Sequence, residues 1–492
     1  MSGRFRRFLV GMTTGYLAIF INIAYTLASI PLALHYLGKE EFGLWALSQQ
    51  IAGYLILLDL GLSNAISRFF SNWKDNVESA EYKELFGTSF AVYIVQGILI
   101  AVMGLVFSII APWLFHIPES LAIVFQKVLI IITSLSGFSV ACRGISGPIW
   151  AFQRLDVANA SMVFNLISSF VMLWLGFHWG WGIYSLAVAI VPAAIITPFA
   201  MYIFCRNAGY YPKESMLGRP NKALFWKLFH FGKDTMLISL GQQMVNASQI
   251  MVVSRLIGLE MAATFAVGTK IFVLGQQFVG KVLESASPAL TEIYVRGELE
   301  LFRCRYWKMI EISAALAAIG GAGLILGNQS LISVWTDRMI HWPMMCDVLL
   351  GFLLVATSLS RCLTGLFGMI GNNRPIRFIY LVEGGCFLTA AYFGATKYGL
   401  LGVIAASLGA HILVTLGWAI RVQSEFLFKI PVMIRILALG PAICFAVALG
   451  KVSIDLQGIN FFQQLELQAL LFLIACFAVG IYCIKFRLFK MN

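Results

Sequence analysis

Apolar runs of about 20 residues recur along the whole sequence, and they limit what the chain can fold into. A helix of that length, rising 1.5 Å per residue, crosses the hydrocarbon core of a bilayer. Charged residues make up 12% of the chain, against about 25% in soluble domains, and the mean hydropathy is +0.84. The alternating ten-residue strands of a membrane β-barrel do not occur. The sequence therefore predicts an all-α integral membrane protein.

Fourteen runs qualify as transmembrane helices. They are expected at residues 8–34, 43–70, 86–111, 120–142, 157–177, 181–204, 231–254, 262–285, 306–328, 344–370, 376–396, 400–421, 433–449 and 465–485. An even number places both termini on the same side. The loops and ends on that side hold 26 Lys and Arg residues, and the opposite loops hold five. This asymmetry predicts cytoplasmic termini and accounts for the net charge of +12 without a nucleic-acid partner.

The sequence also contains a weak internal repeat. Identical residues recur at a constant offset of 220, at Cys142 and Cys362, Arg154 and Arg374, and Gly182 and Gly402. Six spans separate the two copies, so the copies share one orientation in the membrane and are related by an axis along its normal. We therefore expect an N-terminal six-helix lobe (1–204), a cytoplasmic linker (205–230), a C-terminal six-helix lobe (231–425), and two additional helices with a cytoplasmic tail (426–492).

The eighth predicted span carries charged side chains along one face. Lys270, Gln277, Lys281 and Glu284 fall within about 60° of one another at 3.6 residues per turn. On insertion scales, each charge at mid-depth costs about 2.5–3.5 kcal/mol, so this face is hard to place against lipid. We expect it to line a water-filled cavity that binds substrate.

Amide side chains form a comparable face on two other spans. Asn22 lies on the first span, and Gln242 and Asn246 lie at the equivalent face of the seventh. Two interpretations remain open, because such residues either line a polar path or hold neighbouring helices together.

Other polar residues have simpler explanations. Arg361 and Glu383 lie at similar depth on adjacent predicted spans, so we expect an internal ion pair. The histidines and cysteines show no metal-ligand spacing, and none of the Gly-Lys pairs belongs to a P-loop. We therefore expect no metal, no cofactor, no catalytic residue and no ATP-driven motor.

Two stretches resemble a known family. The segment YLGKEEFGLWALSQQIAGYLILLDLGLSNAISRFFS (36–71) and the segment WAFQRLDVAN (150–159) are similar to the polysaccharide-transport flippases, which carry O-antigen or exopolysaccharide repeat units. These proteins belong to the multidrug/oligosaccharidyl-lipid/polysaccharide exporter superfamily. The resemblance implies two six-helix lobes around a central cleft that opens alternately to each side. The implied cargo is an undecaprenyl-pyrophosphate-linked oligosaccharide, moved to the outer leaflet of a bacterial inner membrane.

Such a cargo needs a polar cavity for its sugars and cations for its pyrophosphate. The amide faces would provide the cavity, and Lys270, Lys281 and Arg68 the cations. Asp59, inside an apolar run, has two interpretations. It is either a gating or coupling carboxylate that faces the cleft, or a structural group that bonds Ser63 or free backbone near Gly61.

Two rival functions remain. A polysaccharide polymerase is also polytopic, but the outer loops here are too short for a catalytic site. A drug or cation antiporter of the same superfamily would favour an acidic cleft, whereas the eighth span is net basic. The expected partners of a flippase are the lipid-linked oligosaccharide, membrane lipids, and the polysaccharide polymerase and chain-length machinery.

Overall fold

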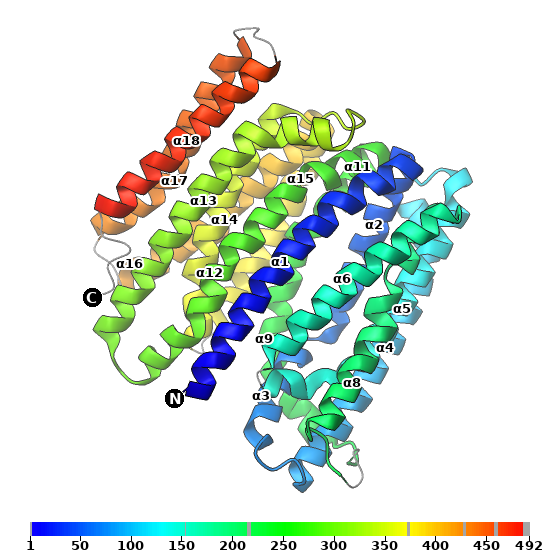
Figure 1. Ribbon diagram of the computed structural model, residues 1–492. Coiled ribbons are helices and arrows are strands. Elements are labelled where there is room, and N and C mark those ends of the chain that lie inside the picture. Colours follow the sequence, from blue (N-terminus) through cyan, green and yellow to red (C-terminus); the bar gives the residue numbers. More distant parts are fainter. Residues whose placement is uncertain are drawn as a thin grey trace. The chain divides into compact units, whose positions relative to one another are not determined.

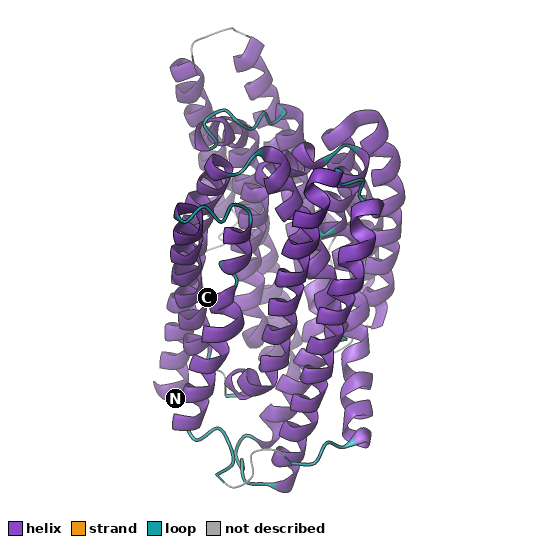
Figure 2. Cartoon of the chain, turned by 90° about the vertical axis from the view of Figure 1, so that its right-hand side faces the viewer, coloured by secondary structure: helices purple, strands orange, loops and turns teal. Residues whose placement is uncertain are grey.

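The computed structural model describes residues 2–152, 154–213, 218–370, 374–426, 430–456 and 461–485. Within these ranges every regular element is a helix, and Figure 2 shows no strand. All fourteen predicted spans coincide with helical segments. Ten described segments are long and apolar enough to cross a membrane, and one of them, Arg374–Val422, contains two predicted spans. The predicted all-α membrane fold is confirmed.

Contacts divide the chain into two compact units, and unit 1 comprises Met1–Gln243 with Gly258–Ala263. The order of its helices can be followed in Figure 1. They are α1 (Ser2–Tyr36), α2 (Lys39–Leu55), η1 (Ile56–Asp59), α3 (Leu62–Trp73), α4 (Ala80–Leu114), α5 (Glu119–Ala151), α6 (Leu155–His178), α7 (Tyr184–Val188), η2 (Pro192–Ile196), α8 (Thr197–Asn207) and most of α9 (Lys222–Asn246).

Unit 2 comprises Met244–Ile257 and Thr264–Asn492. Its helices are α10 (Ser248–Leu256), the second half of α11 (Leu259–Gly268), α12 (Lys270–Val295), α13 (Leu299–Trp335), α14 (Met344–Met369), α15 (Arg374–Ala410), η3 (His411–Leu416), α16 (Gly417–Phe426), α17 (Ile430–Leu456) and α18 (Phe461–Lys485). Helix α15 is bent at Gly399, whose φ of 59° and ψ of −135° are not helical. The bend separates the eleventh and twelfth predicted spans.

Small residues let α4 and α5 pack closely in unit 1. A Cβ atom added to Gly97 would lie 2.4 Å from the carbonyl oxygen of Gly137, and the reverse distance is also 2.4 Å. Close backbone approach at glycine is typical of helix pairs in membranes, where apolar burial from water does not drive association. The start of α4 and the end of α5 contribute to a buried core that includes Phe70 of α3 and Tyr82 and Phe86 of α4.

Part of the predicted cytoplasmic linker is held against the start of α4. The Glu78 carboxylate accepts the backbone N–H of Lys213 at 2.6 Å and forms an ion pair with Lys83 at 3.0 Å. The backbone N–H of Gly218 donates to the carbonyl of Lys83 at 3.0 Å. The N–H of Lys213, and next the Lys83 ammonium, hold the pKa of the Glu78 carboxyl below its ordinary value.

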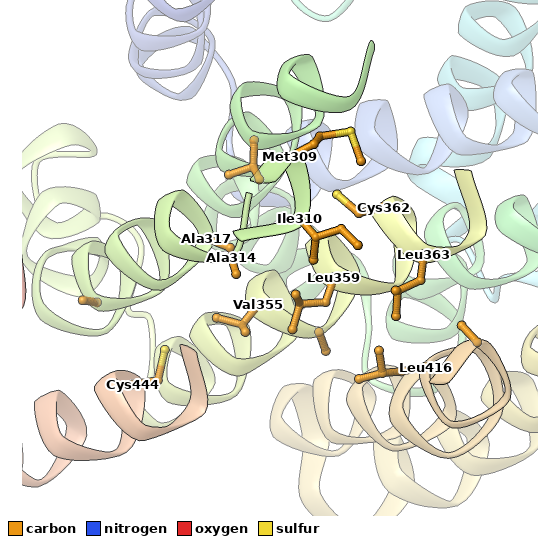
Figure 3. Packing of buried hydrophobic residues seen from close by; sticks show 14 of the residues in the cluster. Met309, Ile310, Ala314, Ala317, Val355, Leu359, Cys362, Leu363, Leu416 and Cys444 are labelled. Carbon is orange, nitrogen blue, oxygen red and sulfur yellow. The ribbon is translucent and has the colours of Figure 1, made fainter. Parts of the chain in front are cut away.

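The core of unit 2 lies where α13 and α14 face each other. Figure 3 shows Met309, Ile310 and Ala314 of α13 packed against Leu359 and Cys362 of α14. Each of these side chains is at most 5% exposed. Burial is greater in this unit than in unit 1, since 67% of the most apolar window of α13 and 72% of that of α14 is buried inside the protein.

Lys451 lies elsewhere than its sequence position suggested. It follows the thirteenth predicted span, which ends at residue 449, and so counts among the five Lys and Arg residues expected in the outer loops, but α17 continues to Leu456 and the Lys451 side chain is buried. Its ammonium donates to the backbone carbonyls of Ile325 at 2.7 Å and Leu326 at 3.3 Å. These bonds attach α17, one of the two additional helices, to α13.

Two π-helical turns occur at equivalent positions of the sequence repeat. One is η2 in the sixth predicted span, and the other is η3 in the twelfth. Residues 192–196 shifted by the repeat offset of 220 become 412–416, which lie within η3. A π-turn holds one extra residue relative to a regular α-helix and is frequent at functional sites.

Candidate functional site

The second predicted span is broken in the middle. After η1, Leu60 and Gly61 have left-handed φ angles of 55° and 70°, and α3 begins at Leu62. A Cβ atom on Gly61 would lie 2.4 Å from the carbonyl oxygen of Gly232 in α9. Glycine is required here both for its backbone conformation and because the backbone of α9 comes so close.

Asp59 ends η1 and binds the first turn of α3. Its Oδ1 accepts the Ser63 hydroxyl at 2.8 Å, and its Oδ2 accepts the Ser63 backbone N–H at 3.4 Å. Gln96 of α4 donates to the Asp59 carbonyl at 2.9 Å, and Tyr93 donates to the Ser63 hydroxyl at 3.0 Å. The bond to Ser63 that the structural interpretation requires is present. A role in gating remains a prediction.

Arg68 lies on α3 about two turns beyond the break. It is exposed, and its guanidinium carbon lies 4.9 Å from the ring centroid of Phe231 in α9. Lys227, also in α9, lies 5.6 Å from the ring of Phe69. These cation–π contacts place two positive charges beside aromatic rings, where each is held by about 0.5–1 kcal/mol at an exposed site.

The charged face of α12 is accessible. Gln277 and Glu284 are exposed, and Lys270 and Lys281 are half-buried. The Lys281 ammonium forms an ion pair with Glu284 at 2.9 Å, one turn along the helix. Because the Glu284 side chain is 69% exposed, this pair is weak and easily exchanged for another anion. The face therefore carries one positive charge in excess.

The amide faces are also partly accessible. On α9, Gln242 and Asn246 are both exposed and lie one turn apart. On α1, Asn22 is half-buried, and its neighbours on the same face, Thr26 and Ser29, are buried. Part of the α1 face is therefore packed inside the protein, whereas both amide side chains on α9 are exposed.

The predicted ion pair between Arg361 and Glu383 is wrong. Arg361 is exposed and lies against Gly280 of α12, where an added Cβ atom would be 2.8 Å from one of its guanidinium nitrogens. It lines a small cavity between α12 and α14, together with Gln276 and Thr357, which are hydrogen-bonded to each other at 3.1 Å. Its charge is therefore directed at α12.

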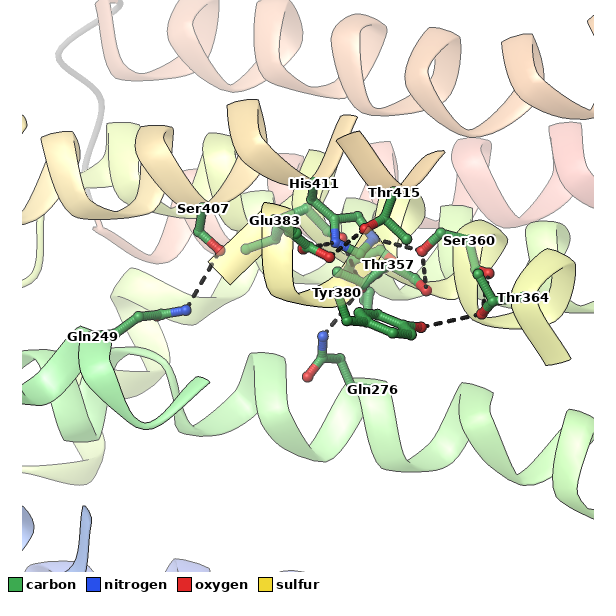
Figure 4. Close-up of polar contacts among 12 residues, drawn as sticks. Gln249, Gln276, Thr357, Ser360, Thr364, Tyr380, Glu383, Ser407, His411 and Thr415 are labelled. Carbon is green, nitrogen blue, oxygen red and sulfur yellow. Dashed lines mark hydrogen bonds and ion pairs between the residues drawn. The ribbon is translucent and has the colours of Figure 1, made fainter. Parts of the chain in front are cut away.

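Glu383 instead belongs to a buried polar cluster that the sequence did not reveal (Figure 4). Its Oε1 lies 2.5 Å from Nδ1 of His411, and its Oε2 accepts the hydroxyl of Thr415. Nε2 of His411 lies 2.5 Å from the Ser360 hydroxyl. We name these four residues the Glu–His cluster. They join α14, α15 and η3 within unit 2.

A sequence signal for this cluster existed. His411 and Thr415 are four residues apart, so they share one helical face, and a carboxylate at similar depth on the preceding span completes the set. From the sequence alone, a lone histidine without metal-ligand spacing is expected to be interfacial or packed, and His411 is buried. Within the described ranges, no group of three His, Cys, Asp or Glu residues is arranged to hold a metal ion.

Comparison with known sequences identifies the family. A family model described as "Polysaccharide biosynthesis protein" matches residues 11–294. The uncharacterized membrane protein EpsK of Bacillus subtilis (strain 168) is 21% identical over 340 residues, or 67% of this chain. The matched region spans 64% of the length of that relative.

Comparison with solved structures identifies the fold. The lipid II flippase MurJ, in an inward closed conformation, has a TM-score of 0.71 at 14% identity, covering 97% of this chain and 99% of that one. An inward-facing multidrug resistance MATE family transporter of the MOP superfamily has a TM-score of 0.68 at 15% identity, covering 81% and 94%. Because the family model matches more than half of its residues, this chain belongs to the polysaccharide biosynthesis protein family, and it has the membrane-transporter fold of the MurJ and MATE structures.

Proposed function

We propose that this protein is a flippase for an undecaprenyl-pyrophosphate-linked oligosaccharide. It would carry the cargo by alternating access from the cytoplasmic to the periplasmic leaflet of a bacterial inner membrane, with both of its own termini in the cytoplasm. The observation that carries the proposal is the accessible face of α12, where Lys270 and Lys281 lie within a segment apolar enough to span the membrane. Family membership and the likeness to a structure titled a lipid II flippase support the class of cargo.

The chemistry of the cargo fits these side chains. A pyrophosphate needs concentrated positive charge, and attraction is stronger in a site of low dielectric constant than in bulk water. Lysine is a point charge without the bidentate geometry of arginine, which favours release of the cargo. When a pyrophosphate binds Lys281, Glu284 has only a weak, exposed ion pair to give up.

The remaining predicted residues have supporting roles in this proposal. Gln277, Gln242, Asn246 and Asn22 would hydrogen-bond sugar hydroxyls, and Arg68 would provide a further cation. Asp59 would act in gating or coupling. The translocated unit would pass to a polysaccharide polymerase and chain-length machinery, and the protein itself would perform no covalent chemistry.

A flipping assay in proteoliposomes tests the proposal. The lipid-linked oligosaccharide is incorporated into vesicles, and its exposure to an external lectin is followed over time. Lys270→Ala and Lys281→Ala are each expected to lower the flipping rate about 10- to 100-fold, as for loss of a hydrogen bond to a charged group worth about 1.5–3 kcal/mol. Lys397→Ala is the matched control, because it removes an exposed lysine at the end of the first part of α15.

The outcomes separate this function from its rival. If the wild-type protein leaves the lipid-linked oligosaccharide in place but moves a lipophilic cation, the antiporter function is correct. If both alanine variants flip at the wild-type rate, the cargo does not depend on the α12 lysines, and the proposed site is wrong.

A further inference from the structure

Unit 1 has a groove between two of its membrane-spanning segments, α6 on one side and η2 with α8 on the other (Figure 1). Its cavity volume is about 370 Å³. One end of the groove lies at the membrane surface, because Asp156 begins the first span and Asn207 ends the second. We propose that this groove binds a phospholipid whose head group carries a phosphate and a primary ammonium. The site is separate from the cargo residues on α12.

The walls of the groove suit an acyl chain. Phe164 of α6 and Met201 of α8 provide apolar surface, and the small side chains of Ala160 and Ala200 leave room between the helices. From residue 156 to residue 164, the groove follows α6 for about 12 Å at 1.5 Å per residue. One leaflet contributes about 15 Å to the hydrocarbon core. A chain in the groove is therefore covered over most of the depth of one leaflet.

A fixed pair of opposite charges lies at the surface end of the groove. Nε of Arg154 donates to Oδ1 of Asp156 at 2.9 Å, and Nη2 donates to Oδ2 at 2.8 Å. The guanidinium carbon lies 4.8 Å from the ring centroid of Phe204, which lines the groove as Asp156 does. Nη1 donates to the Tyr210 hydroxyl at 3.4 Å, and the Tyr210 ring stacks on Phe152. Three side chains therefore hold the guanidinium in place.

Both members of the pair can still bind a head group. Of the five N–H donors of a guanidinium, the bonds to Asp156 and Tyr210 use three, so within the described residues two remain to Arg154. Two such donors match the oxygens of a phosphate. A carboxylate has about four acceptor positions, which leaves Asp156 able to accept N–H bonds from an ammonium. The two side chains are 28% and 34% exposed, so a ligand can reach them.

Charge complementarity selects the head group. A phosphate beside a primary ammonium satisfies the whole pair, with the phosphate at Arg154 and the ammonium at Asp156. A quaternary ammonium keeps the positive charge but has no N–H to donate. A glycerol or polyprenyl head group brings the phosphate without a cation, and the Asp156 carboxylate then repels it.

The second copy of the sequence repeat lacks this arrangement. The offset of 220 takes Arg154 to Arg374, but it takes Asp156 to Ile376 and Phe204 to Ser424. The equivalent arginine therefore lacks the carboxylate and the aromatic ring that hold Arg154. Arg374 is exposed, and its replacement is a matched control for replacement of Arg154.

Native mass spectrometry of the purified full-length protein tests the proposal by counting bound lipids. The delipidated protein is titrated with phosphatidylethanolamine, phosphatidylcholine and phosphatidylglycerol that have the same acyl chains. We expect phosphatidylethanolamine to bind about 3- to 10-fold more tightly than the other two, since the charged bonds that it adds are partly exposed to water. Equal affinity for the three lipids overturns the proposal.

Two variants test the charged pair. Arg154→Gln should weaken binding of phosphatidylethanolamine about 3- to 10-fold, whereas Arg374→Gln should not change it. Asp156→Asn should lower the affinity for phosphatidylethanolamine to that for phosphatidylcholine. Wild-type lipid affinities in Arg154→Gln and Asp156→Asn contradict the assigned roles of the pair.

A third variant fills the groove and leaves the charged pair in place, so it decides the matter even if the charge variants do not fold. Ala200→Leu should weaken binding of all three lipids, and Ala390→Leu, at an exposed alanine of α15, should not. Unchanged binding of phosphatidylethanolamine in Ala200→Leu overturns the proposal.

The same spectra identify other occupants of the groove. If a polyprenyl phosphate binds more tightly than phosphatidylethanolamine and is lost in Ala200→Leu, the groove holds the cargo and not a phospholipid. If a dimer of the wild type is lost in that variant, the groove holds a second copy of the chain, and the phospholipid assignment is again wrong. None of these measurements depends on flipping, so failure of the proposed function leaves the lipid site to be decided by itself.

Discussion

Replacement of Asp59 tests what a carboxylate does inside an apolar run. In Asp59→Ala, Ser63 loses two bonds, one from its backbone N–H and one from its hydroxyl. Loss of a helix-capping side chain costs about 0.5–2 kcal/mol, and a typical hydrogen bond contributes about 0.5–1.5 kcal/mol net. Because Asp59 is only half-buried, water can replace part of the lost hydrogen bonding. We therefore expect the free energy of unfolding to fall by about 1–3 kcal/mol.

Asparagine at the same position separates charge from hydrogen bonding. Asn and Asp are similarly effective as capping residues, so Asp59→Asn should lose less than about 1 kcal/mol. The free energies are compared by thermal unfolding of the purified protein in one detergent. A double-mutant cycle with Ser63→Ala should give a coupling energy of about 0.5–1.5 kcal/mol between the two side chains.

Two results would contradict this reasoning. If Asp59→Asn unfolds as readily as Asp59→Ala, the bonds to Ser63 do not account for the stability that the carboxylate provides. If Asp59→Asn keeps its stability but loses flipping, then the negative charge itself is needed, and the gating interpretation is correct.

Two further variants follow from contacts within unit 1. Gly61→Ala should destabilise the protein by about 1–2 kcal/mol from the left-handed φ alone, and by more because the added methyl group meets the Gly232 carbonyl. The change is measured by thermal unfolding. The control is Gly53→Ala in α2, where nothing lies within 4 Å of the added atom. Glu78→Gln should speed amide hydrogen exchange at Lys213, measured by mass spectrometry, whereas Glu81→Gln should not. The folded-state pKa of Glu78 is lowered, so the ionised carboxylate stabilises the folded protein above the ordinary pKa of 4.5. This stabilisation is lost as the pH falls through the folded-state pKa. On acidification, the melting temperature of the wild type should therefore fall more than that of Glu78→Gln.

The spans could be predicted from the sequence because bilayer thickness fixes how long an apolar helix must be. The Asp-Leu-Gly stretch at 59–61 also placed a polar group and a glycine together, and the structure breaks the helix there. The contacts between helix faces could not be predicted in the same way. Sequence gives the depth of a residue along its helix axis, but not which neighbour each face of the helix meets.

Arg361 and Ser360 show this limit. Consecutive residues on an α-helix point about 100° apart at 3.6 residues per turn. Ser360 faces His411, so Arg361, one residue later, is directed to α12 and away from Glu383. Both residues lie at the depth that the sequence indicated. The ion pair was assigned to the wrong partner because depth alone cannot choose between them.

The paired π-turns η2 and η3 bear on the ancestry of the chain. Each is the trace of one residue inserted into a regular helix. An insertion made in one copy after duplication would have changed the offset between the copies by one residue from that point onward. Equivalent turns instead occur at the same offset of 220 as Gly182 and Gly402, which precede them. If the repeat arose by duplication, one insertion before that event accounts for both turns, whereas an insertion after it would have widened a single copy.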